Sequence, residues 1–219
     1  MTVPRADKAP SFKAAVVPVT PFEQNCALIW NEVTKAGAIV DPGGDIDRIM
    51  AAIEQVGLMP EKILLTHGHI DHAGGAAELR QKLNVPIEGP HLADKFLLDH
   101  LEEQGAAYGF PARKVTPDRW LADGDQVTIG EHVFDILHCP GHSPGSVVFQ
   151  SKTQKFLIMG DVLFRGSIGR SDLPQGDHDM LIASIRNKLL VLDDSYAFLC
   201  GHGPGSTIGL ERRTNPFLT

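Results

Sequence analysis

Four side chains that commonly bind metal ions fall close together in this chain, at His67, His69, Asp71 and His72. The apolar run before them predicts a strand and the alanine-rich run after them predicts a helix, so all four lie on a short turn. Imidazole and carboxylate groups together suit zinc, iron or manganese. A single tetrahedral ion needs four ligands. This turn already offers four, so further ligands from distant parts of the chain would be more than one ion can use. The sequence therefore predicts two metal ions side by side.

The composition suits a protein that buries a substantial core, because 42% of the 219 residues are hydrophobic and 21% are charged. A formal net charge of -7 disfavours nucleic acid and anionic membranes as partners, since both attract basic surfaces. Cys26, Cys139 and Cys200 form no CxxC pair and are interpreted as buried structural thiols. No apolar run reaches the length of a signal peptide or a membrane span. We therefore expect a cytoplasmic protein with no nucleic-acid or membrane partner.

Short β-prone segments and helical patterns follow one another in two similar halves, which predicts one α/β domain over residues 1–219 with residues 1–10 as a loose tail. The expected strands are 12–19, 26–30, 37–40, 63–66, 85–87, 126–129, 132–138, 146–150, 156–159 and 197–200. The expected helices are 45–56, with Asp45 as its cap, 73–83, 178–190 and 209–213. Two mostly antiparallel sheets should pack together with helices outside. Glycines and a proline suggest that residues 91–119 are a flexible cover rather than core.

Three further polar side chains each follow a glycine at the end of an apolar strand, at His142, Asp161 and His202. Glycine lets the backbone turn sharply and approach an ion closely. A lone histidine after a strand is more often a packing or surface residue, but the HxHxDH turn makes these side chains its expected partners. The other histidines are interpreted as surface residues or as supports behind the ligands: His91, His100, His132, His138 and His178.

The HxHxDH turn, followed in order by PGHS, GD and GHG, resembles the metallo-β-lactamase-fold hydrolases over nearly the whole chain. The segment 160–174 and the ending 201–218 are similar to the short bacterial glyoxalase II-like (hydroxyacylglutathione hydrolase-like) proteins. The resemblance implies a four-layer αββα sandwich of two mixed, mostly antiparallel sheets. It also implies a small-molecule thioester substrate, S-lactoylglutathione or a related hydroxyacyl-glutathione. Oligomeric state is left open by the sequence.

The resemblance implies a role for each candidate ligand. The implied groups are His67, His69 and His142 for one ion, Asp71, His72 and His202 for the other, and Asp161 as the bridge between them. Both ions would be divalent, Zn²⁺ first, with iron or manganese as alternatives. Asp41 matches a position that supports the ligands from behind, whereas the sequence itself suggests a turn aspartate equally well.

The resemblance also implies that a hydroxide shared by the ions attacks the thioester carbonyl while Asp71 orients it. Larger glyoxalase II enzymes hold glutathione with a basic residue after the GD motif, and Arg170 occupies that position, with a structural salt bridge as its alternative role. The tyrosine that they carry two residues later is Asp172 here, and their C-terminal helical extension is expected to be absent. Weak affinity for glutathione thioesters, or a different substrate, is therefore expected. Arg165 and Arg213 are weaker candidates for substrate binding, and a solvated or structural role is preferred for both.

Other reactions share this metal chemistry. A lactonase or a phosphodiesterase would use the same hydroxide, because the nucleophile does not select the electrophile. A persulfide dioxygenase shares the HxHxDH turn but uses one iron and molecular oxygen. The GSIGRSDLP segment and the GHGP ending favour the hydrolase. The acidic balance disfavours a nuclease, and the complete ligand set disfavours a non-enzymatic scaffold.

Overall fold

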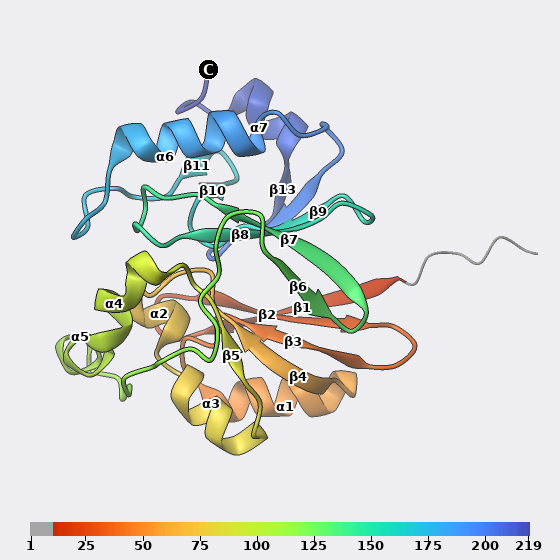
Figure 1. Cartoon of the computed structure of the whole chain (residues 1–219), viewed down its shortest axis with the longest axis vertical. Coiled ribbons are helices and arrows are strands. Elements are labelled where there is room, and N and C mark those ends of the chain that lie inside the picture. Colours follow the sequence, from red (N-terminus) through yellow and green to blue (C-terminus); the bar gives the residue numbers. More distant parts are fainter. Residues whose placement is uncertain (1–10) are drawn as a thin grey trace, which may run out of the picture.

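The computed structural model describes residues 11–219, so the loose tail expected at residues 1–10 lies outside the described residues. Two sheets pack face to face, with helices on both outer sides (Figure 1). This arrangement confirms the expected four-layer αββα sandwich of mixed sheets. No helix among residues 11–219 is long and apolar enough to span a bilayer.

The first sheet has the strand order β1-β2-β3-β4-β5. Its strands are β1 (Phe12–Val19), β2 (Gln24–Asn31), β3 (Ala36–Val40), β4 (Met59–Leu64) and β5 (Ile87–Glu88). The first three pair antiparallel, whereas β4 and β5 join in parallel. The parallel pairing requires crossovers, and the helices of this half supply them.

The second sheet has the order β13-β12-β9-β8-β7-β6, and only β12 and β9 pair in parallel. Its strands are β6 (Gln126–Ile129), β7 (His132–His138), β8 (Val147–Ser151), β9 (Phe156–Ile158), β12 (Ala197–Leu199) and β13 (Ser206–Thr207). A separate hairpin joins β10 (Leu163–Phe164) to β11 (Ser167–Ile168). The sequence analysis missed β10, β11 and β13 because two-residue strands are too short to show alternation.

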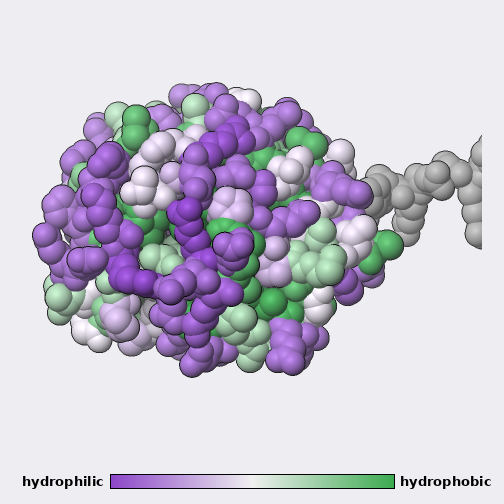
Figure 2. All heavy atoms as spheres, turned by 60° about the horizontal axis from the view of Figure 1, so that its bottom comes forward, coloured by the Kyte–Doolittle hydropathy of each residue, from purple (hydrophilic) through white to green (hydrophobic). Residues whose placement is uncertain are grey.

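Helices cover the outer face of each sheet (Figure 1). The first sheet carries α1 (Ile46–Val56) and α3 (Ala76–Leu83), and the second carries α6 (His178–Ser184), a π-helical continuation (Ile185–Leu189) and α7 (Ile208–Thr214). Three short helices, α2 (Ile70–Ala73), α4 (Lys95–Asp99) and α5 (Leu101–Tyr108), lie together at one side of the sandwich. Mostly hydrophilic side chains cover the face that Figure 2 shows.

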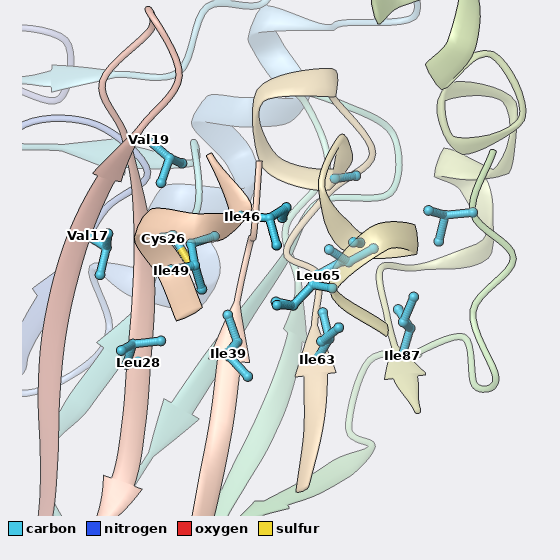
Figure 3. Close-up of a cluster of buried hydrophobic side chains, with 14 of the residues drawn as sticks. Val17, Val19, Cys26, Leu28, Ile39, Ile46, Ile49, Ile63, Leu65 and Ile87 are labelled. Carbon is cyan, nitrogen blue, oxygen red and sulfur yellow. The ribbon is translucent and has the colours of Figure 1, made fainter. Parts of the chain in front are cut away.

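Aliphatic side chains fill the space between α1 and the first sheet. Ile46 and Ile49 project from the helix towards Ile39 and Ile63 on the strands (Figure 3). A further cluster between the sheets includes the fully buried Phe134 and Phe149. Burial of a large apolar side chain contributes about 1.5–3 kcal/mol, so these layers hold the strand ends in fixed positions.

Four predictions about this framework need correction. Asp45 precedes α1, but its side chain does not cap the helix, because its carboxylate accepts a hydrogen bond from the Thr20 backbone N–H at 2.8 Å. The helix expected over 73–83 begins three residues later, as α3 at Ala76, because Ala73 ends α2 and a turn at Gly74–Gly75 separates the two helices. A side chain at Gly75 would meet the Pro42 carbonyl oxygen at 2.6 Å. The chain therefore needs a glycine where this turn packs against the β3–α1 loop.

The segment 91–119 and one histidine also differ from expectation. Leu98, Leu101 and Val115 are buried in the first core cluster, so the segment contributes to the core as well as covering it. His132 is 5% exposed and packs edge-on against Phe12, with ring centroids 5.5 Å apart. It is therefore a core residue and not the surface or supporting histidine that was expected. The cysteines are free and buried, as expected.

Candidate metal centre

The turn between β4 and α2 brings its side chains to the edge where three strands of the second sheet end. His142 follows β7, Asp161 follows β9 and His202 follows β12. Three residue groups there place ligand atoms within 4.8 Å of one another. They are His67, His69 and His142; Asp71, His72 and His202; and Asp41, His67 and His72. The fold thus brings together the candidate ligands that the sequence places far apart.

Ring nitrogens face one another in the first group, which consists of His67, His69 and His142. His142 Nε2 lies 3.2 Å from His67 Nε2 and 3.0 Å from His69 Nδ1. The His142 Nδ1–H donates to the Arg170 carbonyl oxygen at 2.8 Å, so its Nε2 carries a lone pair. Neutral imidazoles with facing lone pairs repel one another. A cation between these nitrogens would remove that repulsion, which is the arrangement of a histidine metal site.

Thr66 fixes the tautomer of His67 in the same way. The Thr66 hydroxyl donates to Asp41 Oδ2 at 2.6 Å, so its oxygen accepts from His67 Nδ1–H at 3.0 Å. The Nε2 atom of His67 is therefore also a lone-pair donor that faces the cluster. Metal-binding histidines are commonly held by such a bond at the other ring nitrogen.

The second group combines carboxylates with imidazoles. His202 Nε2 lies 3.2 Å from Asp71 Oδ2, and His72 Nε2 lies 3.3 Å from Asp161 Oδ1. The second Asp161 oxygen lies 3.6 Å from His202 Nε2 and 3.7 Å from His142 Nε2. The one carboxylate of Asp161 therefore reaches both groups.

Two buried atoms of this group, His72 Nε2 and Asp161 Oδ1, have no hydrogen-bond partner in the described chain. Buried polar atoms are normally paired, because an unpaired one costs about 1–3 kcal/mol. A bound cation would satisfy both atoms at once. The residues present therefore fit two divalent ions.

The two ligand groups of the site differ in the charge states of their histidines. Burial, with neighbouring histidines, lowers the pKa of His67 well below its ordinary value and that of His69 to about 3. Burial also opposes charge on His72, but the carboxylates of Asp161 and Asp71 outweigh it and raise the pKa of His72 well above its ordinary value. In the metal-free protein the first group is thus neutral at pH 7, whereas the second holds protons that metal ions would replace.

Asp41 lies behind the ligands rather than among them. Its carboxylate accepts from the Thr66 backbone N–H at 2.7 Å, from the Thr66 hydroxyl and from His72 Nδ1–H at 2.9 Å. These donors occupy the oxygens that a metal would need. Asp41 therefore orients His72 directly and His67 through Thr66.

Two of the glycines that precede ligands are required by space. A side chain at Gly201 would lie 2.0 Å from Asp161 Oδ1, and one at Gly160 would lie 2.5 Å from Thr66 Oγ1. Gly160 also adopts φ 53°, which disfavours other residues. The glycine-before-ligand pattern thus follows from the close packing of strand ends around the cluster.

The sequence analysis missed Asp94, a fully buried carboxylate beside the site. It accepts hydrogen bonds from the Gly68 backbone N–H and the Ser143 hydroxyl, each at 2.8 Å, and from the Gly145 backbone N–H. Burial raises the pKa of Asp94 to about 6. Asp94 therefore ties the turn at His67–His72 to the turn that carries His142.

Replacing Asp94 with alanine should lower the free energy of unfolding by about 1–3 kcal/mol, because it leaves buried donors unpaired. Urea unfolding of the metal-free protein measures this. Asp99→Ala is the matched control, since Asp99 lies on the same segment but pairs with the surface residues Lys95 and Lys114. Equal losses for the two variants would contradict the role of Asp94.

A cavity of about 920 Å³ opens beside the cluster. Its walls come from the cluster itself, from Phe22, from α4 and α5 with Phe96 and Tyr108, and from the β10–β11 hairpin. Arg165 and Arg170 both line it. Arg213, by contrast, pairs with Asp194 on the surface and does not line the cavity.

The comparisons with known proteins agree with this geometry. The sequence profile of the metallo-beta-lactamase superfamily matches residues 19–202, and the chain belongs to that superfamily of metal-dependent hydrolases. Hydroxyacylglutathione hydrolase GloC of Haemophilus influenzae is 47% identical over 205 residues, which span 93% of this chain and 96% of that relative. The resemblance to the glyoxalase II-like subgroup is therefore confirmed.

Solved structures support the same fold. The B3 metallo-beta-lactamase BLEG-1 has a TM-score of 0.86 at 39% identity and covers 95% of this chain and 100% of its own. TTHA1623, solved in a di-iron-bound form, has a TM-score of 0.84 at 40% identity and covers 93% of this chain and 100% of its own. The fold and the histidine–aspartate groups together imply divalent metal ions.

Proposed function

We propose that this chain is a dinuclear metal-dependent hydrolase that cleaves a thioester, with S-lactoylglutathione or a related hydroxyacyl-glutathione as the first candidate. The observation that carries the proposal is the convergence of two ligand groups on the shared carboxylate of Asp161, beside a cavity of about 920 Å³. The name of the relative GloC supports the thioester class.

In this proposal, His67, His69 and His142 would hold one ion, Asp71, His72 and His202 would hold the other, and Asp161 would contribute to both sites. Zn²⁺ is the first candidate, and the di-iron form of TTHA1623 makes iron a second. When bound, the ions supply a water acidified towards hydroxide and positive charge beside the carbonyl oxygen. No serine or cysteine nucleophile is needed.

Asp71 is the residue of the cluster placed to orient the attacking water. It lines the cavity, and its side chain is 18% exposed. Burial alone would raise its pKa, but His72 and His202 outweigh that effect and lower it. The ionised carboxylate can accept a hydrogen bond from the water while it holds the second ion.

The test is a substrate panel on protein of known metal content: S-lactoylglutathione, other thioesters, lactones, phosphodiesters and a glutathione persulfide. We expect release of free thiol from a thioester without oxygen uptake. Hydrolysis confined to a lactone or phosphodiester would overturn the thioester assignment. Oxygen uptake on the persulfide with one iron per chain would replace the hydrolase with a dioxygenase.

Acidification should remove the two ions in a fixed order. A raised pKa means that a proton competes with the metal already at neutral pH, and the pKa values of His72 and His202 are both raised. The lowered pKa values of His67 and His69 keep that pair neutral to lower pH. Each displaced proton weakens binding by up to about tenfold per pH unit. The ion at Asp71, His72 and His202 should therefore leave first.

Native mass spectrometry after equilibration in a metal buffer between pH 8 and pH 5 measures this order. We expect a population with one ion per chain at intermediate pH. Variants locate that ion: His69→Ala should abolish the one-ion species, and His202→Ala should leave it intact. The opposite pattern, or joint loss of both ions, would contradict the assignment.

A further inference from the structure

The wall of the cavity outside the metal cluster is cationic, although the chain carries a formal net charge of -7. Its ionisable side chains there are Arg165, Arg170, His100 and Tyr108, and among residues 11–219 no carboxylate lines the cavity beyond Asp71 and Asp161 of the cluster. A local reversal of charge at a binding site selects ligands of the opposite sign. The cavity therefore suits an anionic substrate.

The two arginines are not equally free to bind an anion. Arg170 Nε and Nη2 donate to the two oxygens of Asp172, each at 2.8 Å, in a bidentate pair. That hydrogen bonding lowers the pKa of Asp172 to about 2, so the pair stays ionised and its charges cancel. The Arg165 guanidinium, by contrast, makes no hydrogen bond or ion pair with residues 11–219.

The backbone around Arg165 is held from behind by two buried polar side chains, Glu211 of α7 and Asn215 directly after that helix. The Gly166 backbone N–H donates to Glu211 Oε2 at 2.8 Å, and Asn215 Nδ2 donates to the Ser167 carbonyl oxygen at 3.0 Å. Asn215 Nδ2 also donates to Glu211 Oε2, and both residues are fully buried. Glu211 and Asn215 belong to the ending 201–218, which is similar to the glyoxalase II-like proteins. Their role in the structure is to support the hairpin backbone.

The same hairpin touches the metal cluster. The ring of Phe164 on β10 lies edge-on to that of His202, with centroids 6.3 Å apart. The backbone of the next residue, Arg165, is therefore held on the cavity wall near a candidate ligand of the second ion, while the Arg165 side chain is exposed.

We propose that Arg165, rather than Arg170, binds a carboxylate of the substrate, and that the substrate is an anionic thioester. The thioester part rests on the proposed function. The arginine part rests on the cavity charge, the Arg170–Asp172 pair and the fixed hairpin. Asp172 thereby becomes a specificity residue, because it neutralises the other arginine of the wall.

The test compares metal-loaded wild type with Arg165→Gln, Arg170→Gln and the control Arg48→Gln, which removes an exposed arginine of α1 that does not line the cavity. The substrates are S-lactoylglutathione and its diethyl ester, in which neither carboxylate is left to bind an arginine. We expect Arg165→Gln to raise KM for the acid about tenfold, with kcat and the diethyl ester little changed, since it removes a charge-assisted hydrogen bond. Arg170→Gln should change KM less than about threefold, because its charge is already paired.

A binding measurement separates this inference from the function. Calorimetric titration with S-methylglutathione, which has no thioester to cleave, should show weaker binding for Arg165→Gln alone. If wild type cleaves no thioester yet binds this probe through Arg165, the proposed function fails and the arginine assignment stands. Loss of affinity in Arg170→Gln instead, an unchanged Arg165→Gln, or no binding by wild type would overturn the inference.

Discussion

Replacing Asp161 with alanine is expected to lower kcat/KM for thioester hydrolysis by about a thousandfold or more and to prevent loading of two ions. Among residues 11–219, Asp161 is the side chain whose oxygens approach His72, His142 and His202 together. Its removal would take away the negatively charged side chain that both ligand groups share. The several kcal/mol that bound ions contribute to such a reaction correspond to at least this factor in rate.

Steady-state kinetics and metal analysis on the same samples measure both effects. Asp47→Ala is the matched control, because Asp47 is 98% exposed and pairs only with Lys82 at the surface. It should keep the wild-type rate and metal content. Retained turnover in Asp161→Ala with two ions per chain would contradict the shared-carboxylate scheme.

Asp41→Ala should have the second-largest effect, although Asp41 is not a proposed ligand. It leaves Thr66 and His72 without their buried acceptor. Loss of one partner of a buried charged pair costs about 3–5 kcal/mol in stability. Loss of a hydrogen bond behind a metal-binding histidine weakens metal affinity by about 10–100-fold.

Chemical unfolding and competition with a chromogenic chelator measure the two losses separately. Asp45→Ala is a close control: Asp45 lies in the same β3–α1 loop with a similar left-handed backbone, φ 48° against 53° for Asp41. It should cost no more than about 1.5 kcal/mol and leave metal affinity unchanged. Should Asp41→Ala fail to fold, Asp41→Asn keeps the shape of the side chain and tests metal affinity. Wild-type metal affinity in both Asp41 variants would contradict a role in metal binding and would leave Asp41 with a role in the turn only.

The grouping of the candidate ligands was predictable because local signals mark each member. The HxHxDH turn is compact in sequence, and His142, Asp161 and His202 each follow a glycine at a strand end. The structure shows why: at Gly160 and Gly201 a side chain would collide with the site. Spatial crowding at the site thus explains the glycines beside Asp161 and His202, whereas Gly141, before His142, is required by its contact with Leu181 of α6.

Asp94 and Arg165 were not predictable in the same way. The partners of Asp94 are mainly backbone N–H groups of two distant turns, which only the folded chain brings together. Arg165 and Arg170 look alike in sequence, and only the pairing of Arg170 with Asp172 distinguishes them. The expected cap at Asp45 was wrong for a similar reason, because a tertiary contact with Thr20 replaced the local one.

The central claim is that two ions held by this cluster hydrolyse a thioester. Its most direct test is to add Zn²⁺ stepwise to metal-free protein and follow thiol release from S-lactoylglutathione at each metal-to-protein ratio. We expect activity to rise steeply with the second equivalent and to stop rising at two ions per chain. Full thiol release at one ion per chain, or none at two ions with Zn²⁺, Fe²⁺ or Mn²⁺, would contradict it.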